Sequence, residues 1–127
     1  FVADFVGTMT FMDATVAGPG RVTAGGIALE TPALGSQPAG ARLRIGFRPE
    51  EIQVRNVTGA TPNRFDARVV LLDYLGSFCR ATLAPEAAPD LKLIADLSSN
   101  AMRDLAIAEG QTIAIALPPA ALRVFPA

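Results

Sequence analysis

The chain has 127 residues, half of them apolar, and a formal net charge of −1, so it is long enough for one folded domain and has no global charge that favours nucleic acid or an anionic membrane. It contains no His and one Cys, which argues against a zinc site, a Ser-His-Asp triad and an internal disulfide. No apolar run approaches the roughly 20 residues that span a bilayer, and the chain starts at Phe1 without a Met, so we expect a soluble piece of a longer polypeptide.

Alternation of apolar and polar residues predicts short strands along most of the chain. Leu43, Ile45 and Phe47, for example, share one face of a strand while Arg42 and Arg44 share the other. In chain order the predicted strands are Phe11–Val16, Ile27–Glu30, Ala41–Phe47, Phe65–Leu75, Phe78–Leu83, Leu91–Leu97 and Gln111–Leu117. Turn formers rich in Gly, Pro and Asn separate them. The pattern predicts an all-β sandwich or barrel.

Helix is scarce in the sequence. One short helix is predicted over Ala101–Ala108, capped by Ser99 or Asn100 and ended by Gly110. The stretch Phe1–Val6 is predicted as either one helical turn or the start of a strand.

An internal repeat is visible when GARLRIGFRPEEIQV at 40–54 is aligned with GQTIAIALPPAALRV at 110–124. The two stretches share glycine, apolar and proline positions at one offset of 70, since 119 − 49 = 70. A second alignment matches 4–16 with 73–83 at an offset that begins at 69. Self-similarity of this kind indicates a duplicated structural unit, and a half of about 60 residues is marginal alone. We therefore expect two halves, about 4–54 and 73–124, that pack together and exchange strands.

Four stretches together resemble a known family: FVADFVG at the start, IGFRPEEI at 45–52, DYLGS at 73–77 and GQTIAIALPPAALRVF at 110–125. In this order they are similar to the C-terminal regulatory region of the ATP-binding subunits of bacterial ABC importers, the TOBE (transport-associated OB) domain of the MOP-like group. The resemblance covers nearly the whole chain, 1–127. It implies a duplicated OB-fold-like barrel made of two tandem halves with exchanged strands.

The resemblance also implies a function and partners. It implies a non-catalytic regulatory and dimerising domain, with its own ATPase domain and a second copy as direct partners and the membrane permease subunits as indirect ones. The expected location is cytoplasmic, at the inner face of the bacterial membrane. The phosphate-binding G-x-x-x-x-G-K-[ST] loop is absent from this chain, so we expect no enzyme activity, no metal and no cofactor in this fragment.

The first candidate site is the charged corner formed by Arg48, Glu50 and Glu51. A structural interpretation accounts for the corner itself, because Pro49 fixes φ and the two glutamates open a single helical turn. The second copy of the repeat keeps Pro119 but loses all three charges. The three charged residues are therefore predicted to contact a neighbouring domain or subunit.

The second candidate is an anion pocket formed by Thr8, Ser77 and Arg80, since amides and a hydroxyl that follow a glycine can surround a small anion. The simpler interpretation is that Gly7 and Gly76 supply turns. Cys79 is predicted to be a buried thiol. The alternative function is therefore a small oxyanion-binding domain of the MOP-like group. Binding of single-stranded nucleic acid is disfavoured by the net charge and by the absence of Trp, so we expect no nucleic-acid partner.

Overall fold

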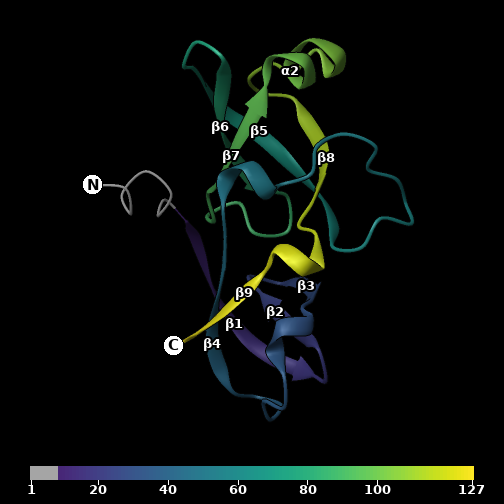
Figure 1. The fold of residues 1–127 in the computed structure, drawn as a ribbon, viewed down its shortest axis with the longest axis vertical. Coiled ribbons are helices and arrows are strands. Elements are labelled where there is room, and N and C mark those ends of the chain that lie inside the picture. Colours follow the sequence, from purple (N-terminus) through teal and green to yellow (C-terminus); the bar gives the residue numbers. More distant parts are fainter. Residues whose placement is uncertain (1–8) are drawn as a thin grey trace.

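Two β-sheets are stacked along the long axis of the molecule in the computed structural model, which describes residues 9–127 (Figure 1). The first sheet has the order β3-β2-β1-β4-β9, and the second has the order β7-β6-β5-β8. The strands of the first sheet are β1 (Thr10–Gly18), β2 (Arg21–Ala24), β3 (Ile27–Glu30), β4 (Arg42–Phe47) and β9 (Arg123–Pro126). Those of the second are β5 (Arg64–Tyr74), β6 (Phe78–Pro85), β7 (Leu93–Ser98) and β8 (Thr112–Ala116). The predicted all-β fold class is confirmed.

The predicted strands form for the expected reason. In β1 the side chains of Met12, Ala14 and Val16 are buried, while Asp13 and Thr15 between them are exposed. The sequence analysis missed β2 and β9, which have four residues each. The interpretation of Phe1–Val6 lies outside the described residues.

The one α-helix described, α2, spans Ser99–Leu105. The predicted boundaries were wrong at both ends. The cap is Ser98, whose hydroxyl oxygen accepts a hydrogen bond of 3.1 Å from the amide of Ala101, because the extended backbone at the end of β7 points the hydroxyl at the first turn. The helix ends where Ala106 adopts a left-handed conformation, before Gly110. No helix in the described part of the chain has the length and apolarity needed to cross a membrane.

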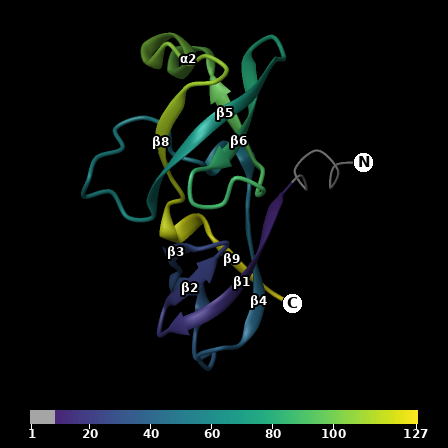
Figure 2. The same ribbon diagram turned by 180° about the vertical axis from the view of Figure 1, so that it is seen from behind.

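Strands are exchanged between the two halves of the chain. β9 comes from the end of the second half but pairs with β4 of the first sheet, with Ile45 opposite Val124. In return, Gln53 from the first half exchanges two backbone hydrogen bonds of 2.9 Å with Ala116 of β8. Figure 2 shows from behind how β9 runs down to lie beside β4. The predicted strand exchange is confirmed.

The three short 3₁₀ helices follow the same exchange. They are η1 (Pro32–Leu34), η2 (Pro49–Glu51) and η3 (Pro119–Ala121). η2, which belongs to the first half, packs against β7 of the second sheet, while η3, from the second half, packs against η1 of the first. The segments that follow β4 and β8 therefore both cross to the other half, in agreement with the first sequence alignment, which matched 40–54 with 110–124.

The second alignment is not supported by the strand order. It matched Ala14–Val16 with Ala81–Leu83, but the first stretch lies in β1, whose equivalent by position in its sheet is β5, and the second lies in β6. By position in the sheets, the counterpart of β1 is β5, which begins at Arg64, and the bounds of about 4–54 and 73–124 stay a prediction. Residues 4–8 of that alignment lie outside the described part. The two stretches Ala14–Val16 and Ala81–Leu83 share the alternation that is common to β-strands.

The core is continuous between the two sheets. Its fully buried side chains include Ile45 and Phe47 from the first half and Leu83, Ile115 and Leu117 from the second, all in one cluster. Neither half alone would bury this surface, which explains why a unit of this size is duplicated.

A single side chain, that of Asn63, joins both sheets. Asn63 has a positive φ of 57° and directly precedes β5. Its amide oxygen accepts a hydrogen bond of 2.7 Å from the backbone N–H of Glu30, and its amide nitrogen donates to the backbone carbonyls of Glu30 at 2.9 Å and of Leu117 at 2.8 Å. Asn63 therefore fixes the end of β3 against the end of the second sheet.

We expect Asn63→Ala to lower the free energy of unfolding by about 2–3 kcal/mol, because three hydrogen bonds are lost and alanine resists a positive φ. Asn63→Gly is the matched control, since it removes the same amide but accepts the backbone conformation, and it should be milder by about 1 kcal/mol. Urea unfolding of both variants measures the difference. Equal stability of Asn63→Ala and the parent chain would contradict the role given to this residue.

Candidate functional site

The charged corner predicted from the sequence is η2, which follows β4 directly. Pro49 occupies the first position of this turn, and the carboxylate of Glu51 closes it by accepting a hydrogen bond of 2.7 Å from the backbone N–H of Arg48. The prediction that Pro49 and the glutamates form a single helical turn is confirmed. Residues 48–51 therefore form this turn through contacts among themselves.

Glu51 also bonds across the two halves. Arg123 of β9 donates from both terminal nitrogens to its carboxylate, at 2.8 Å and 3.1 Å, in a two-pronged pair. The side-chain hydrogen bond from Arg123 is the main cause that holds the pKa of Glu51 below its ordinary value, and the amide of Arg48 lowers it further. Glu51 thus has an internal partner. The sequence analysis missed Arg123 because only the exchange of β9 brings it to this corner.

Arg48 and Glu50 flank this internal pair. Glu50 is exposed and lines a shallow groove of about 410 Å³ between the η2 segment and the start of α2. The prediction that Arg48, Glu50 and Glu51 contact a neighbouring domain stays a prediction. The structure adds that the carboxylate of Glu51 already bonds to Arg123 within the chain, so Glu51 also has an internal structural role.

The predicted anion pocket is only partly within the described residues, since Thr8 lies outside them. Gly76 has a φ of 87° in the turn between β5 and β6, which is the simpler interpretation of that glycine. The carbonyl of Ser77 accepts a hydrogen bond of 3.1 Å from the hydroxyl of Ser99, so this loop is fastened to the start of α2. These contacts are structural.

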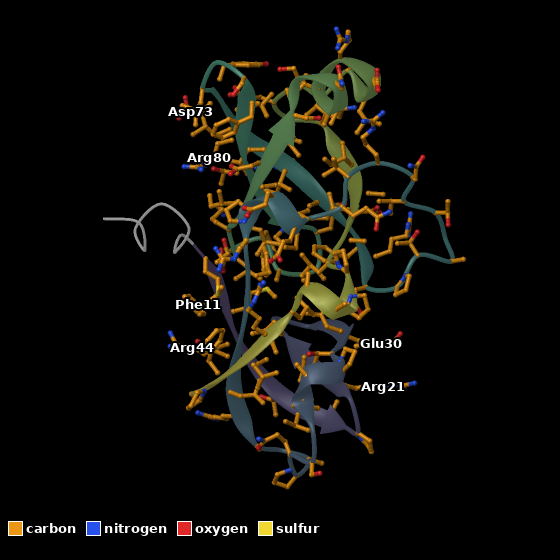
Figure 3. The ribbon with its side chains drawn as sticks, viewed as in Figure 1. Phe11, Arg21, Glu30, Arg44, Asp73 and Arg80 are labelled. Carbon is orange, nitrogen blue, oxygen red and sulfur yellow. The ribbon has the colours of Figure 1, made fainter. Side chains whose placement is uncertain are left out.

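Arg80, the cation of that predicted pocket, is held by a carboxylate of its own chain. Its guanidinium donates to both oxygens of Asp96 on β7, at 2.8 Å and 3.1 Å, and this bond is the main cause that raises the pKa of Arg80. Asp73 is directly opposite Arg80 on β5, and Asp96 is directly opposite on β7. The three side chains form a charged row across three strands, of which Figure 3 labels Asp73 and Arg80. The row has one positive and two negative members.

Cys79 lies beneath this row. The Cys79 side chain is 1% exposed, and its neighbours on the same face of β6 are no more exposed than that. Burial is the first cause that raises the pKa of the Cys79 thiol. The prediction of a buried thiol is confirmed. A raised pKa keeps the sulfur protonated, which disfavours nucleophilic chemistry here.

We expect the Glu51–Arg123 pair to contribute about 1 kcal/mol at neutral pH, since both side chains are partly exposed. Because the folded-state pKa of Glu51 is depressed, this contribution is present above the ordinary value of 4.5 and is lost as the pH falls through the folded-state pKa. Glu51→Gln should therefore be less stable than the parent chain at neutral pH and should approach it in acid. Thermal unfolding across this pH range measures the convergence.

Glu50→Gln is the matched control, because it changes the adjacent carboxylate, which has no bond to Arg123 in the described residues. It should change the pH dependence less than Glu51→Gln does, because Glu50 acts on Arg123 only through a weaker coulombic interaction. A gap between Glu51→Gln and the parent chain that stays constant from neutral to acid pH would contradict the assignment.

Comparison with known proteins places this architecture in a family. The model of the TOBE domain matches residues 45–125. The sulfate/thiosulfate import ATP-binding protein CysA 2 of Chromobacterium violaceum is 29% identical over 99% of this chain, and the Fe(3+) ions import ATP-binding protein FbpC 2 of Rhizobium meliloti is 31% identical over 98%. The sn-glycerol-3-phosphate import ATP-binding protein UgpC of Yersinia pestis is 33% identical over 98%. The chain spans about a third of each relative, at 34%, 34% and 33% of their lengths.

A solved structure shows the same fold. The cytoplasmic molybdate-binding protein ModG, in a form with molybdate bound, superposes with a TM-score of 0.74 over 93% of this chain and 96% of that chain, at 12% sequence identity. This likeness confirms the predicted duplicated, MOP-like fold. The match of the family model over residues 45–125 shows that the chain belongs to the TOBE domain family.

Proposed function

We propose that this domain is the non-catalytic regulatory and dimerising part of the ATP-binding subunit of an ABC-type solute importer. The observation that supports it most is that relatives named as import ATP-binding proteins align with 98–99% of this chain, while the chain covers only 33–34% of each of them. A TOBE domain of this size is therefore one part of such a subunit. The remaining two thirds of the subunit would supply the ATPase.

The contacts within the domain fit a mechanical role. At the corner, Glu51 bonds to Arg123, and on the second sheet, Arg80 bonds to Asp96. These charged groups therefore have partners within the domain. The exchanged segments and the shared core join the two halves into one unit. In the proposed subunit, this unit keeps two ATPase domains tethered while they close on ATP and open after hydrolysis. Its place would be the cytoplasmic face of the membrane, beside the permease subunits.

A chimera tests the proposal. The third of the sn-glycerol-3-phosphate import ATP-binding protein UgpC of Chromohalobacter salexigens that aligns with this chain, at 33% identity, is replaced by residues 1–127. We expect the chimera to restore sn-glycerol-3-phosphate uptake to cells that lack UgpC, above the level given by UgpC without that third. The proposal is overturned by a chimera that accumulates normally but transports no better than the truncated protein.

Oxyanion binding is the second candidate, favoured by the likeness to molybdate-bound ModG. The bond between Arg80 and Asp96 argues against a site at Ser77 and Arg80, because the cation is already neutralised there. We expect no heat when molybdate, sulfate, phosphate or phosphonate is titrated into the chain in a calorimeter. Heat that is abolished by Arg80→Gln would reverse the preference between the two candidates.

A further inference from the structure

A pocket of about 330 Å³ lies at the end of the second sheet, between the β5–β6 turn and α2. Figures 1 and 2 show this turn and α2 together at one end of the molecule. The apolar part of its lining comes from Tyr74, Phe78, Met102 and Ile107. Ligand pockets in proteins begin at about 300 Å³, so this one has room for one small molecule.

The two halves of the chain differ at this place. By strand order, η1 between β3 and β4 is the counterpart of α2 between β7 and β8. Leu34 of η1 is 3% exposed and belongs to the shared core, whereas Met102 of α2 is only partly buried. The second half therefore leaves apolar surface uncovered where the first half buries a leucine.

Exposed apolar side chains are concentrated at the same end of the molecule. Four of the five large apolar residues that are exposed in the described part of the chain lie close together in sequence: Val70, Leu71, Tyr74 and Leu75. Tyr74, which is 70% exposed, also lines the pocket. Apolar surface gathered in one place marks a site where an apolar group binds. A ligand of this pocket therefore has an apolar part.

Arg103 of α2 is the charged member of the lining. Its guanidinium donates a hydrogen bond to the side-chain oxygen of Asn100, which is neutral, so this bond leaves the positive charge in place. The adjacent carboxylate, that of Asp104, is bound to Arg55. Arg103 has no carboxylate partner among residues 9–127, in contrast to Arg80. The pocket therefore offers a cation beside apolar side chains.

We propose that this pocket binds a small aromatic carboxylic acid, with its carboxylate on the guanidinium of Arg103. Arg holds a carboxylate well, because its planar fork makes two parallel hydrogen bonds. The rings of Tyr74 and Phe78 pack against the ring of the ligand, and the thioether of Met102 makes a favourable sulfur–aromatic contact. The guanidinium carbon of Arg80 lies 5.7 Å from the centroid of the Phe78 ring and helps to hold that ring in place.

This inference goes beyond the proposed function and does not rest on it. The chimera measures transport, whereas binding of an aromatic acid is measured on residues 1–127 alone. The site also differs from the anion pocket predicted from the sequence, because an inorganic oxyanion has no apolar part to place on the rings.

Tyrosine fluorescence reports on this pocket directly. Tyr74 is the one Tyr of the sequence and there is no Trp, so the emission comes from a side chain that lines the site. The probe is phenylacetate, and phenylacetamide, which has the same ring and no charge, is its matched control. We expect a saturable change in emission with phenylacetate at a Kd of about 1 mM, and binding of phenylacetamide that is at least about tenfold weaker. Acetate, which has the charge without the ring, should give no saturable change.

Two variants separate the charge from the apolar wall. Arg103→Gln should weaken phenylacetate by at least about tenfold and leave phenylacetamide within about twofold of its parent value. Met102→Ala should weaken both probes by a similar factor, because it removes apolar contact and no charge. Circular dichroism verifies the fold of each variant.

Arg21→Gln is the control for Arg103→Gln, since it makes the same change at the level of the first sheet, away from α2 (Figure 3). It should leave the binding of both probes unchanged. The inference is overturned by emission that does not respond to phenylacetate, by acetate or phenylacetamide that binds as tightly as phenylacetate, or by Arg103→Gln acting no more strongly than Arg21→Gln.

Discussion

The hydrogen bonds between β9 and β4, and those that Gln53 returns to Ala116, hold the two halves of the chain together. A half of this size buries too little surface to be stable alone. The second half places its last strand, β9, in the sheet of the first half, and the first half places Gln53 against β8, so each half covers a strand edge that would otherwise be open to pairing. The continuous core between the sheets is the consequence.

Two polar contacts depend on this exchange. Arg123 reaches Glu51 only because β9 lies beside β4, and the resulting pair ties the corner after β4 to the end of the chain. Asn63 likewise ties the two halves together, because its side chain bonds to the end of β3 and to the residue that follows β8. Each is a bond between segments far apart in the sequence, so their loss should be felt by both sheets.

The outer faces of the sheets are left with the groups that the internal contacts do not use. On the first sheet this is the stacked pair of Phe11 and Arg44, and on the second it is Asp73 between two exposed leucines. These groups lie on the surface of a domain whose two halves share one core.

The sequence by itself determined the elements whose cause is local. Alternation specified seven of the strands, Pro49 and the two glutamates specified the corner, and the repeat at an offset of 70 indicated the duplication and the partnership of the halves. Local patterns failed where the cause was not local. The strand at 123–126 and the second alignment, which confused β1 with β6, each required knowledge of which strand lies next to which. Arg80 looked like a free cation and Glu51 like a free anion, because their partners are 16 and 72 residues away and only the sheet register brings them together. Side-chain spacing along a strand is fixed by the backbone, whereas the neighbours across a sheet are chosen by burial of the shared core, which is decided by the whole chain at once.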